Sequence, residues 1–303
     1  GSEMCIRDRF AVMNTLKHLL LFTTACSSHP AIMAQETAPQ RPNVVIILGD
    51  DIGYGDLSCN GEKTIHTPHV DALAHQGLRF TNAHAVASTS TPARYSLLTG
   101  HYAWRRNDTG IAPGDAGMII RPEQYTLADL FQSCGYTTAA VGKWHLGLGD
   151  KTAQQDWNAP LPTALGDLGF DYSYIMAATA DRVPCVFIEN GQVANYDPSA
   201  PIEVSYTHNF PGEPTGKDNP ELLYNLKPSN GHNMSIVNGI SRIGFMKGGG
   251  KALWKDENIA DSITAHAVSF IEQHKDEPFF MYFATNDAVS YTHLRAHETC
   301  ADL

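Results

Sequence analysis

A serine, a proline and an arginine stand in a fixed register at Ser90, Pro92 and Arg94. Proline fixes φ and suits a turn at a helix start, so the spacing predicts a helix over residues 93–98 that opens just after Ser90. Backbone N–H groups at a helix N-terminus stabilise an anion. Arg94 can reach back toward a developing oxyanion with its planar fork of donors. Without this spacing, Ser90 would be interpreted as an ordinary loop serine.

Two adjacent carboxylates, Asp50 and Asp51, follow the apolar, β-branched run of residues 43–48. That run predicts a strand buried on both faces, and ligands bind at the carboxyl ends of such strands in open α/β sheets. Hard cations such as Ca²⁺ or Mg²⁺ take six or more oxygen donors, so the pair makes half of a cation site. The residues alone leave open a solvated turn that caps a helix.

A third polar group follows a strand predicted over residues 137–141, where Lys143 and His145 flank Trp144 after Gly142. In isolation, this group is typical of a surface turn after a strand, with the tryptophan as packing. Beside the serine motif, Lys143 is a candidate for a positive charge near an anion, and His145 is a candidate for proton transfer.

Together these motifs resemble the two signatures of the sulfatase family. Residues 90–100 follow the pattern Cys or Ser-x-Pro-x-Arg-x4-Thr-Gly, and residues 135–145 match the second signature position by position. The run after Asp51 also resembles the run after the family's metal pair. The resemblance covers about residues 42–288. It implies an alkaline-phosphatase-like α/β fold, a mostly parallel sheet flanked by helices, incomplete at the C-terminus.

The resemblance implies a chemistry centred on Ser90. It makes Ser90 the precursor of formylglycine, whose hydrate attacks a sulfate ester, and a ligand of the metal together with Asp50 and Asp51. Ca²⁺ is the expected ion, ahead of Mg²⁺. The implied partners are a sulfated glycan or aryl sulfate and a maturation enzyme that oxidises the serine.

The other catalytic roles also come from the resemblance. Arg94 and the metal would hold the charge of the attacking group, Lys143 would face the nucleophile or the sulfate, and His145 would act as the base. One alternative is a phosphatase or phosphonate monoester hydrolase of the same superfamily, although the register of Pro92 and Arg94 favours sulfate. Another alternative is a non-catalytic protein that binds sulfated glycans.

The C-terminal segment departs from the family pattern. Val289 stands where the family has a histidine, and residues 289–303 resemble translated sequencing-adapter sequence. An Asp-Asn pair and a second lysine are expected further on in the family. We therefore expect the chain as written to bind metal poorly, to turn over little and to fold badly, because the strand predicted at 279–284 would lack neighbours in its sheet.

The N-terminal segment predicts export. Residues 1–12 are interpreted as a non-native leader, and residues 13–34 have the basic start and short apolar run of a signal peptide, with cleavage after Ala34. Lipid attachment at Cys26 ranks lower, because Thr23 is a poor residue three places before a lipidated cysteine. The expected location is the periplasm or the medium, with residues 35–288 as the catalytic domain.

The composition agrees with a folded protein that handles a small anion. The chain has 303 residues, 43% hydrophobic and 17% charged, with a net charge of −11. No run of Lys and Arg points to a nucleic-acid partner, and no transmembrane span is visible. The cysteines outside the ends, Cys59, Cys134 and Cys185, have no paired spacing and are expected to be buried free thiols.

Strands and helices alternate along the rest of the sequence, which indicates βαβ units and a mostly parallel sheet. Helices are expected at 67–77, 126–135 and 259–272, and strands at 78–80, 185–188 and 278–284. His66 and His69 are expected to face solvent, and the glycine-rich run 247–251 is expected to be a flexible loop. His232 and residues 180–185 could contact substrate, but an ordinary loop histidine is the preferred interpretation of the former.

Overall fold

The central element is a six-stranded sheet. In the computed structural model, which describes residues 41–225, 227–229 and 231–287, the strand order is β1-β10-β2-β3-β4-β5. The strands are β1 (Val44–Leu48), β2 (Thr137–Lys143), β3 (Tyr172–Met176), β4 (Phe187–Glu189), β5 (Gln192–Val193) and β10 (Phe279–Ala284). β1, β10, β2 and β3 are parallel, and β4 and β5 continue the sheet antiparallel. The predicted mostly parallel α/β sheet is confirmed.

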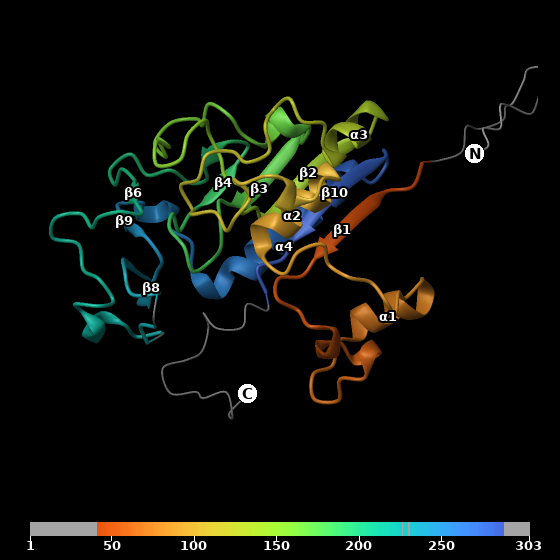
Figure 1. Cartoon of the computed structure of the whole chain (residues 1–303), viewed down its shortest axis with the longest axis horizontal. Helices are drawn as coiled ribbons and strands as arrows, with labels where there is room; N and C mark the ends of the chain where they lie inside the picture. The colour runs from red at the N-terminus through yellow and green to blue at the C-terminus, as the bar shows by residue number, and fades with distance from the viewer. Residues whose placement is uncertain (1–40, 226, 230, 288–303) are drawn as a thin grey trace, which may run out of the picture. The chain divides into compact units, whose positions relative to one another are not determined.

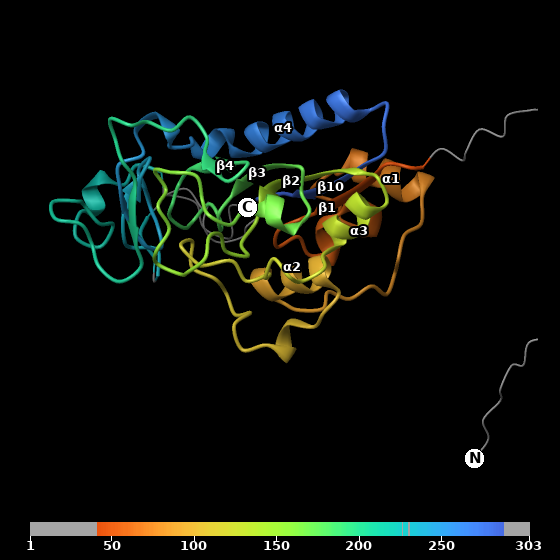
Figure 2. The ribbon, with the colours of Figure 1, turned by 90° about the horizontal axis from the view of Figure 1, so that it is seen from above.

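Helices cover both faces of the sheet (Figures 1 and 2). α2 (Ser90–Thr99) and α3 (Leu127–Ser133) lie on one face, and α4 (Ile259–His274) lies on the other. α1 (Pro68–Gln76) lies beyond β1 and buries none of its residues. Thr126 caps α3 and Pro68 opens α1, as the sequence predicted.

Short elements complete the described part of the chain. Two small hairpin sheets pair β6 (Glu203–Ser205) with β9 (Phe245–Lys247) and β7 (Ile236–Val237) with β8 (Ile240–Ser241). The 3₁₀ helices are η1 (Tyr54–Asp56), η2 (Ser58–Asn60), η3 (Ala103–Arg105), η4 (Leu165–Leu168), η5 (Pro220–Leu222), η6 (Gly250–Ala252) and η7 (Asp256–Asn258). No helix within residues 41–287, leaving out 226 and 230, is long and apolar enough to cross a membrane.

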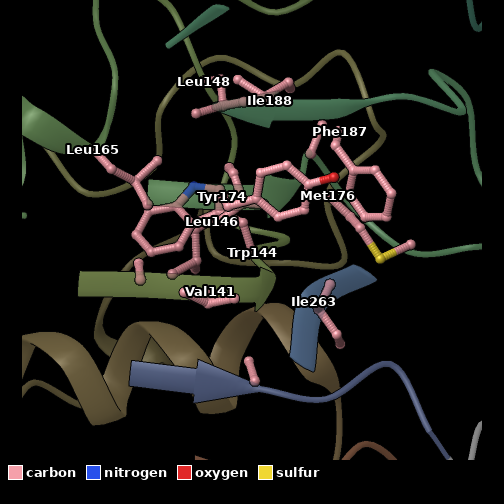
Figure 3. Close-up of a cluster of buried hydrophobic side chains, with 14 of the residues drawn as sticks. Val141, Trp144, Leu146, Leu148, Leu165, Tyr174, Met176, Phe187, Ile188 and Ile263 are labelled. Atoms are coloured by element: carbon pink, nitrogen blue, oxygen red, sulfur yellow. The ribbon is translucent and has the colours of Figure 1, made fainter. Parts of the chain in front are cut away.

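The core lies around β2 and β3, and Figure 3 shows part of it. Trp144 and Leu146, which directly follow β2, pack with Tyr174 and Met176 of β3. Trp144 is fully buried, and its indole N–H donates to the carbonyl of Gly147. The buried tryptophan and the β2–β3 pairing therefore fix the backbone on both sides of Lys143 and His145.

Two predictions about the sheet are wrong. The strand at 279–284 does not lack neighbours, because β10 lies between β1 and β2 and is hydrogen-bonded to both. β1 was expected to be buried on both faces, but it is an edge strand with one neighbour in the described structure. Its side chains alternate in exposure, and Ile47 is 61% exposed. The apolar composition of a strand does not specify its position in the sheet.

Some local predictions are also corrected. The helix predicted at 93–98 begins at Ser90, because Pro92 occupies its first turn instead of preceding it. Residues 78–80 form no strand, and Leu78 is 89% exposed. The strand predicted at 185–188 is shifted to Phe187–Glu189. His66 and His69 are exposed, as predicted.

The expectation of buried free thiols holds for only one of the three cysteines. Cys59, Cys134 and Cys185 are all free, but Cys134 is exposed and Cys59 is partly buried. Cys185 is buried next to β4, where burial raises the pKa of its thiol to about 12. A thiol in that environment is unreactive at neutral pH.

Candidate active site

The site is built around the carboxylate of Asp50, which lies two residues after the end of β1 and is 5% exposed. Lys143 at the end of β2 places its Nζ 2.6 Å from Asp50 Oδ2, and Arg94 of α2 places a guanidinium nitrogen 3.2 Å from Oδ1. All three side chains are buried. Since two cations face one carboxylate here, the described residues leave an excess of positive charge that suits an anionic ligand.

Arg94 connects this carboxylate to Ser90. Its Nε donates to Ser90 Oγ at 2.8 Å across one helical turn. Its Nη1 donates to the carbonyl of Lys143 at 2.8 Å and to the hydroxyl of Tyr282 at 2.9 Å. Tyr282 belongs to β10, so two strands, one helix and the segment after β1 fix the guanidinium. The Ser90 hydroxyl therefore lies at the start of α2 with an immobilised cation beside it.

Opposing effects act on the pKa of the buried Lys143 side chain. Burial and the nearby Arg94 guanidinium lower the pKa of Lys143, and they outweigh the ion pair with Asp50. A lysine with a lowered pKa gives up its proton more readily than an exposed lysine. Its place beside the anion site is consistent with a functional role.

His145 is buried with one ring nitrogen in use and one without a partner. Its Nε2 donates to the carbonyl of Ala112 at 2.9 Å, so Nδ1 carries the free lone pair of the neutral ring. Burial, followed by the charges of Lys143 and Arg182, lowers the pKa of His145 to about 3. The ring is therefore neutral at pH 7, and burial opposes its protonation.

Thr91 joins His145 to the start of α2. The Thr91 hydroxyl donates to the backbone carbonyl of His145 at 2.9 Å and accepts the backbone N–H of Ala112 at 3.2 Å. His145 has a φ of 58°, a left-handed conformation that costs energy for a residue with a Cβ. These bonds hold the strained backbone beside residue 90, although no direct hydrogen bond joins the His145 ring to Ser90 in the described structure.

A second polar cluster follows β3. Asp181 accepts hydrogen bonds from Arg182 at 3.1 Å and from His232 Nε2 at 2.9 Å, and Thr179 also donates to it. Burial raises the pKa of Asp181, but the His232 hydrogen bond, the Arg182 charge and the Thr179 hydroxyl outweigh it and lower the pKa. The charge of Arg182 acts on His145, so the cluster lies near the proposed reaction centre.

The residues present do not complete a shell for the expected cation. Asp50 is occupied by Lys143 and Arg94, and Asp51 is exposed. The side-chain oxygen of Asn286 is buried and has no hydrogen-bond partner in the described structure. Asn286 lies near Asp50, because the backbone N–H of Asp50 donates to the carbonyl of the next residue, Asp287. Within the described ranges, no group of three His, Cys, Asp or Glu residues could hold a metal. A hard ion would need further oxygen ligands.

The structure thus brings together four of the predicted site residues through direct contacts: Asp50, Ser90, Arg94 and Lys143. Asp51 stands outside this group, and His145 joins it through the backbone and through charge. The sequence analysis missed Tyr282, whose polar tip inside an apolar strand was the available signal. His232 lies in a loop, as preferred, and its Nε2 is hydrogen-bonded to Asp181; its contact with substrate stays a prediction.

Comparison with known proteins connects this geometry to one family. The sulfatase family model matches residues 42–288. An N-acetylgalactosamine-6-O-sulfatase of Bacteroides thetaiotaomicron is 55% identical over 248 residues, which are 82% of this chain and 48% of that protein. The steryl-sulfatase of Mus musculus is 39% identical over 157 residues, 47% of this chain and 25% of that protein.

A solved structure gives the same result. A B. thetaiotaomicron protein described within the metabolism of multiple glycosaminoglycans superposes with a TM-score of 0.81 at 54% identity. The match covers 83% of this chain and 52% of that chain. The chain therefore spans about half the length of the similar bacterial proteins.

Proposed function

Because the chain belongs to the sulfatase family, we propose that the whole protein hydrolyses a sulfate ester of a glycan with residue 90 as the nucleophile. The observation that carries the proposal is the contact of Arg94 with Ser90 Oγ inside a buried, positively charged site. A sulfate monoester is an anion with three terminal oxygens, which the donors of a guanidinium and an ammonium recognise. Charge that develops on those oxygens in the transition state would be stabilised by groups already fixed in place.

Residue 90 lies at the point where backbone and side-chain donors converge. As the first residue of α2, Ser90 lies beside unpaired N–H groups of the first helical turn. Oxidised to formylglycine, residue 90 would supply a geminal diol, with one hydroxyl for attack on sulfur and one for release of sulfate. Arg94 Nε then holds the oxygen of residue 90 in position for the attack.

Lys143 and His145 complete the proposed assignment. Asp50 pairs with both Arg94 and Lys143. When a sulfate enters beside Asp50, the Lys143 ammonium can therefore contact the sulfate while Arg94 still pairs with Asp50. The Nδ1 of His145 has no partner in the described structure, so we propose it as the acceptor of the proton from the hydroxyl that expels sulfate. Burial opposes this protonation, so the negative charge of the bound sulfate must stabilise the imidazolium. Both roles follow from charges and lone pairs that the described fold leaves in place.

A divalent cation, Ca²⁺ ahead of Mg²⁺, remains part of the proposal for the whole protein. Asp50, Asp51 and the oxygen of residue 90 are the proposed ligands from this chain, and the remaining oxygens must come from outside the described residues. Such an ion would neutralise negative charge at the nucleophile. The roles given above to Arg94, Lys143 and His145 do not depend on it.

The proposed substrate is a 6-O-sulfated amino sugar of the galactosamine type. This choice rests on the bacterial protein that is 55% identical and is named for that activity. We also propose the boundaries predicted from the sequence: a non-native leader at 1–12, an export signal at 13–34, the catalytic domain at 35–288, and a tail at 289–303 that derives from sequencing-adapter sequence. Signal residues and tail lie outside the described residues. Export would place the enzyme in the periplasm or the medium, with lipidation at Cys26 as the lesser alternative.

The test is sulfate release from N-acetylgalactosamine 6-sulfate by the protein expressed from its full gene in a host that makes formylglycine. Arg94→Lys should lower kcat/KM at least 100-fold, because an ammonium cannot make the four contacts of the guanidinium. Arg105→Lys, which changes an exposed arginine outside the site, is the matched control and should stay within about twofold.

Mass spectrometry of the peptide that contains residue 90 reports on the modification. A loss of two hydrogens is expected from oxidation of the serine. Faster release of phosphate than of sulfate from matched monoesters would favour the phosphatase alternative. Binding of sulfated sugars without any release would favour the non-catalytic one.

A further inference from the structure

Thr91, the residue next to the proposed nucleophile, directs its side chain into the protein interior. It is fully buried, and its hydroxyl makes two hydrogen bonds. The hydroxyl donates to the backbone carbonyl of His145 at 2.9 Å and accepts the backbone N–H of Ala112 at 3.2 Å. Both partners are distant in the sequence, whereas a threonine in a helix more often bonds to nearby backbone. The hydroxyl therefore joins α2 to two other segments of the chain.

These two bonds form part of a closed ring that includes the imidazole of His145. The Nε2 of His145 donates to the carbonyl of Ala112 at 2.9 Å, and the N–H of the same alanine donates to Thr91. Thr91 in turn donates to the carbonyl of His145. The backbone of the histidine is thus held by Thr91 directly, and its imidazole is held through one intervening residue.

The segment that carries Ala112 is fixed to the segment that follows the histidine. The N–H of Ile119 donates to the carbonyl of Leu146, and the N–H of Leu148 donates to the carbonyl of Ala116, both at 2.9 Å. These backbone bonds make the two segments one packed unit. Because the Thr91 hydroxyl links this unit to the start of α2, it fixes where the unit lies relative to residue 90.

The backbone of His145 needs such a restraint. Its φ is 58°, in the left-handed region that a residue with a Cβ adopts at an energetic cost. A hydrogen bond to its carbonyl opposes relaxation to a commoner conformation. The bond from Nε2 also places the proton of the neutral ring on that nitrogen, which leaves the lone pair on Nδ1. Loss of the Thr91 hydroxyl would therefore release the backbone and the imidazole together.

A direct chemical role of Thr91 is excluded by the same contacts. The residue is 0% exposed and its hydroxyl proton is committed to a carbonyl, so it can neither reach a substrate nor serve as a second nucleophile. The remaining alternative is a purely structural role, in which the hydroxyl stabilises the fold without affecting the ring of His145.

We propose that Thr91 is a positioning residue for His145: its hydroxyl fixes the orientation and the tautomer of the imidazole and so keeps Nδ1 as the basic nitrogen. The catalytic part of this inference rests on the proposed function, because it takes His145 as the proton acceptor in sulfate release. The part that concerns the ring is independent of that function.

Nitrogen-15 NMR of the histidine rings tests the ring assignment without any turnover. In the 303-residue chain at pH 7.5, the signals of His145, identified by their absence from His145→Gln, should show a proton on Nε2 and a lone pair on Nδ1. Thr91→Val keeps the shape of the side chain without the hydroxyl, and it should give a mixture of tautomers. Thr91→Ala, with a higher helix propensity, carries the same expectation should the valine variant not fold. Thr91→Ser retains a hydroxyl and should keep the wild-type tautomer.

Thr138→Val is the matched control for the structural alternative. Thr138 is also fully buried, and its hydroxyl donates to the carbonyl of Gly169 at 2.6 Å and accepts the N–H of Asp171 at 3.0 Å, but it lies near the start of β2. Both valine variants should lower the thermal midpoint, since each leaves a buried carbonyl and a buried N–H without that partner. Only Thr91→Val should change the tautomer of His145.

Kinetics of the whole protein supply the second readout. His145 is assigned to the release of sulfate, after the alcohol has left, so Thr91→Val should lower kcat about tenfold or more and change kcat/KM less than about threefold. Thr91→Ser and Thr138→Val should stay within about threefold of the wild type in both constants. Because Thr91 adjoins residue 90, each rate is divided by the fraction of residue 90 that mass spectrometry shows to be modified.

A wild-type tautomer in Thr91→Val, or the same tautomer change in Thr138→Val, would overturn the inference. An unchanged kcat in Thr91→Val with an altered tautomer would overturn its catalytic part. Absence of sulfate release by the wild type would instead count against the proposed function, and the NMR result would still decide the role of Thr91.

Discussion

At the residue scale, the side chains of the site are buried and each is held by hydrogen bonds in one orientation. Arg94 donates hydrogen bonds to Ser90, Asp50, Tyr282 and the backbone carbonyl of Lys143. These bonds fix the orientation of its guanidinium in the site. The His145 ring is equally constrained, because its Nε2 is bound and its Nδ1 is enclosed. Such fixed groups need little reorganisation when charge develops on a substrate.

The buried ring of His145 makes folding sensitive to acid. The pKa of His145 is about 3 in the folded state and about 6.5 in an unfolded chain, so below pH 6.5 the unfolded state binds a proton that the folded state refuses. Stability is therefore present above pH 6.5 and is lost as the pH falls toward 3. Between pH 7.5 and pH 5 this histidine contributes a loss of about 2 kcal/mol.

His145→Gln should reduce the pH-dependent loss of unfolding free energy by that amount, measured by urea denaturation at pH 7.5 and pH 5. His69→Gln, which changes an exposed histidine on α1, is the control and should leave the difference unaltered. An identical pH dependence in wild type and His145→Gln would show that the ring is not held neutral by burial.

At the element scale, the close approach of β2 and β10 positions Lys143. Gly142 precedes that lysine with a φ of 102°, and a Cβ there would lie 1.9 Å from the carbonyl oxygen of Ala284. Only glycine combines this conformation with this contact. The strand pair thus carries Lys143 and Tyr282 to the same side of Arg94.

Gly142→Ala should therefore destabilise the fold by about 3 kcal/mol or more, from the clash and the left-handed backbone together. It should also lower activity of the whole protein, because Lys143 moves with its strand. Gly166→Ala, where a Cβ meets nothing within 4 Å, is the matched control and should change the unfolding free energy by less than about 1 kcal/mol. Equal effects of the two changes in chemical denaturation would contradict this account.

At the scale of the whole molecule, apolar side chains are exposed along β1 at one edge of the central sheet. β1 is an edge strand, and Ile47 on its outer face is exposed while Ile46 packs against the core. The chain spans about half the length of the similar bacterial proteins. Exposed apolar side chains on an unpaired strand edge favour association between copies.

Ile47→Lys should reduce aggregation of the 303-residue chain, measured by light scattering, and change its unfolding free energy by less than about 0.5 kcal/mol. Ile46→Lys, one position along the same strand, should destabilise it by about 2 kcal/mol or more because the charge would face the core. Similar stability losses for both variants would mean that the outer face of β1 is covered in solution.

The sequence by itself predicted that Ser90 and Arg94 lie together at the start of a helix, and the structure confirms that contact. The register of Ser90, Pro92 and Arg94 encodes one helical turn, and the spacing of residues within a turn survives in any fold that keeps the helix. Helices with clear caps, such as the one after Thr126, were equally predictable, because their signals are local. The mostly parallel sheet followed from the alternation of strands and helices.

Only the tertiary structure decided which distant residues meet. The insertion of β10 between β1 and β2 brings Tyr282 to Arg94 across 188 residues, and loop packing brings His232 to Asp181 across 51. The apolar composition of a strand does not specify which strands lie beside it, so strand order and edge exposure could not be predicted from composition.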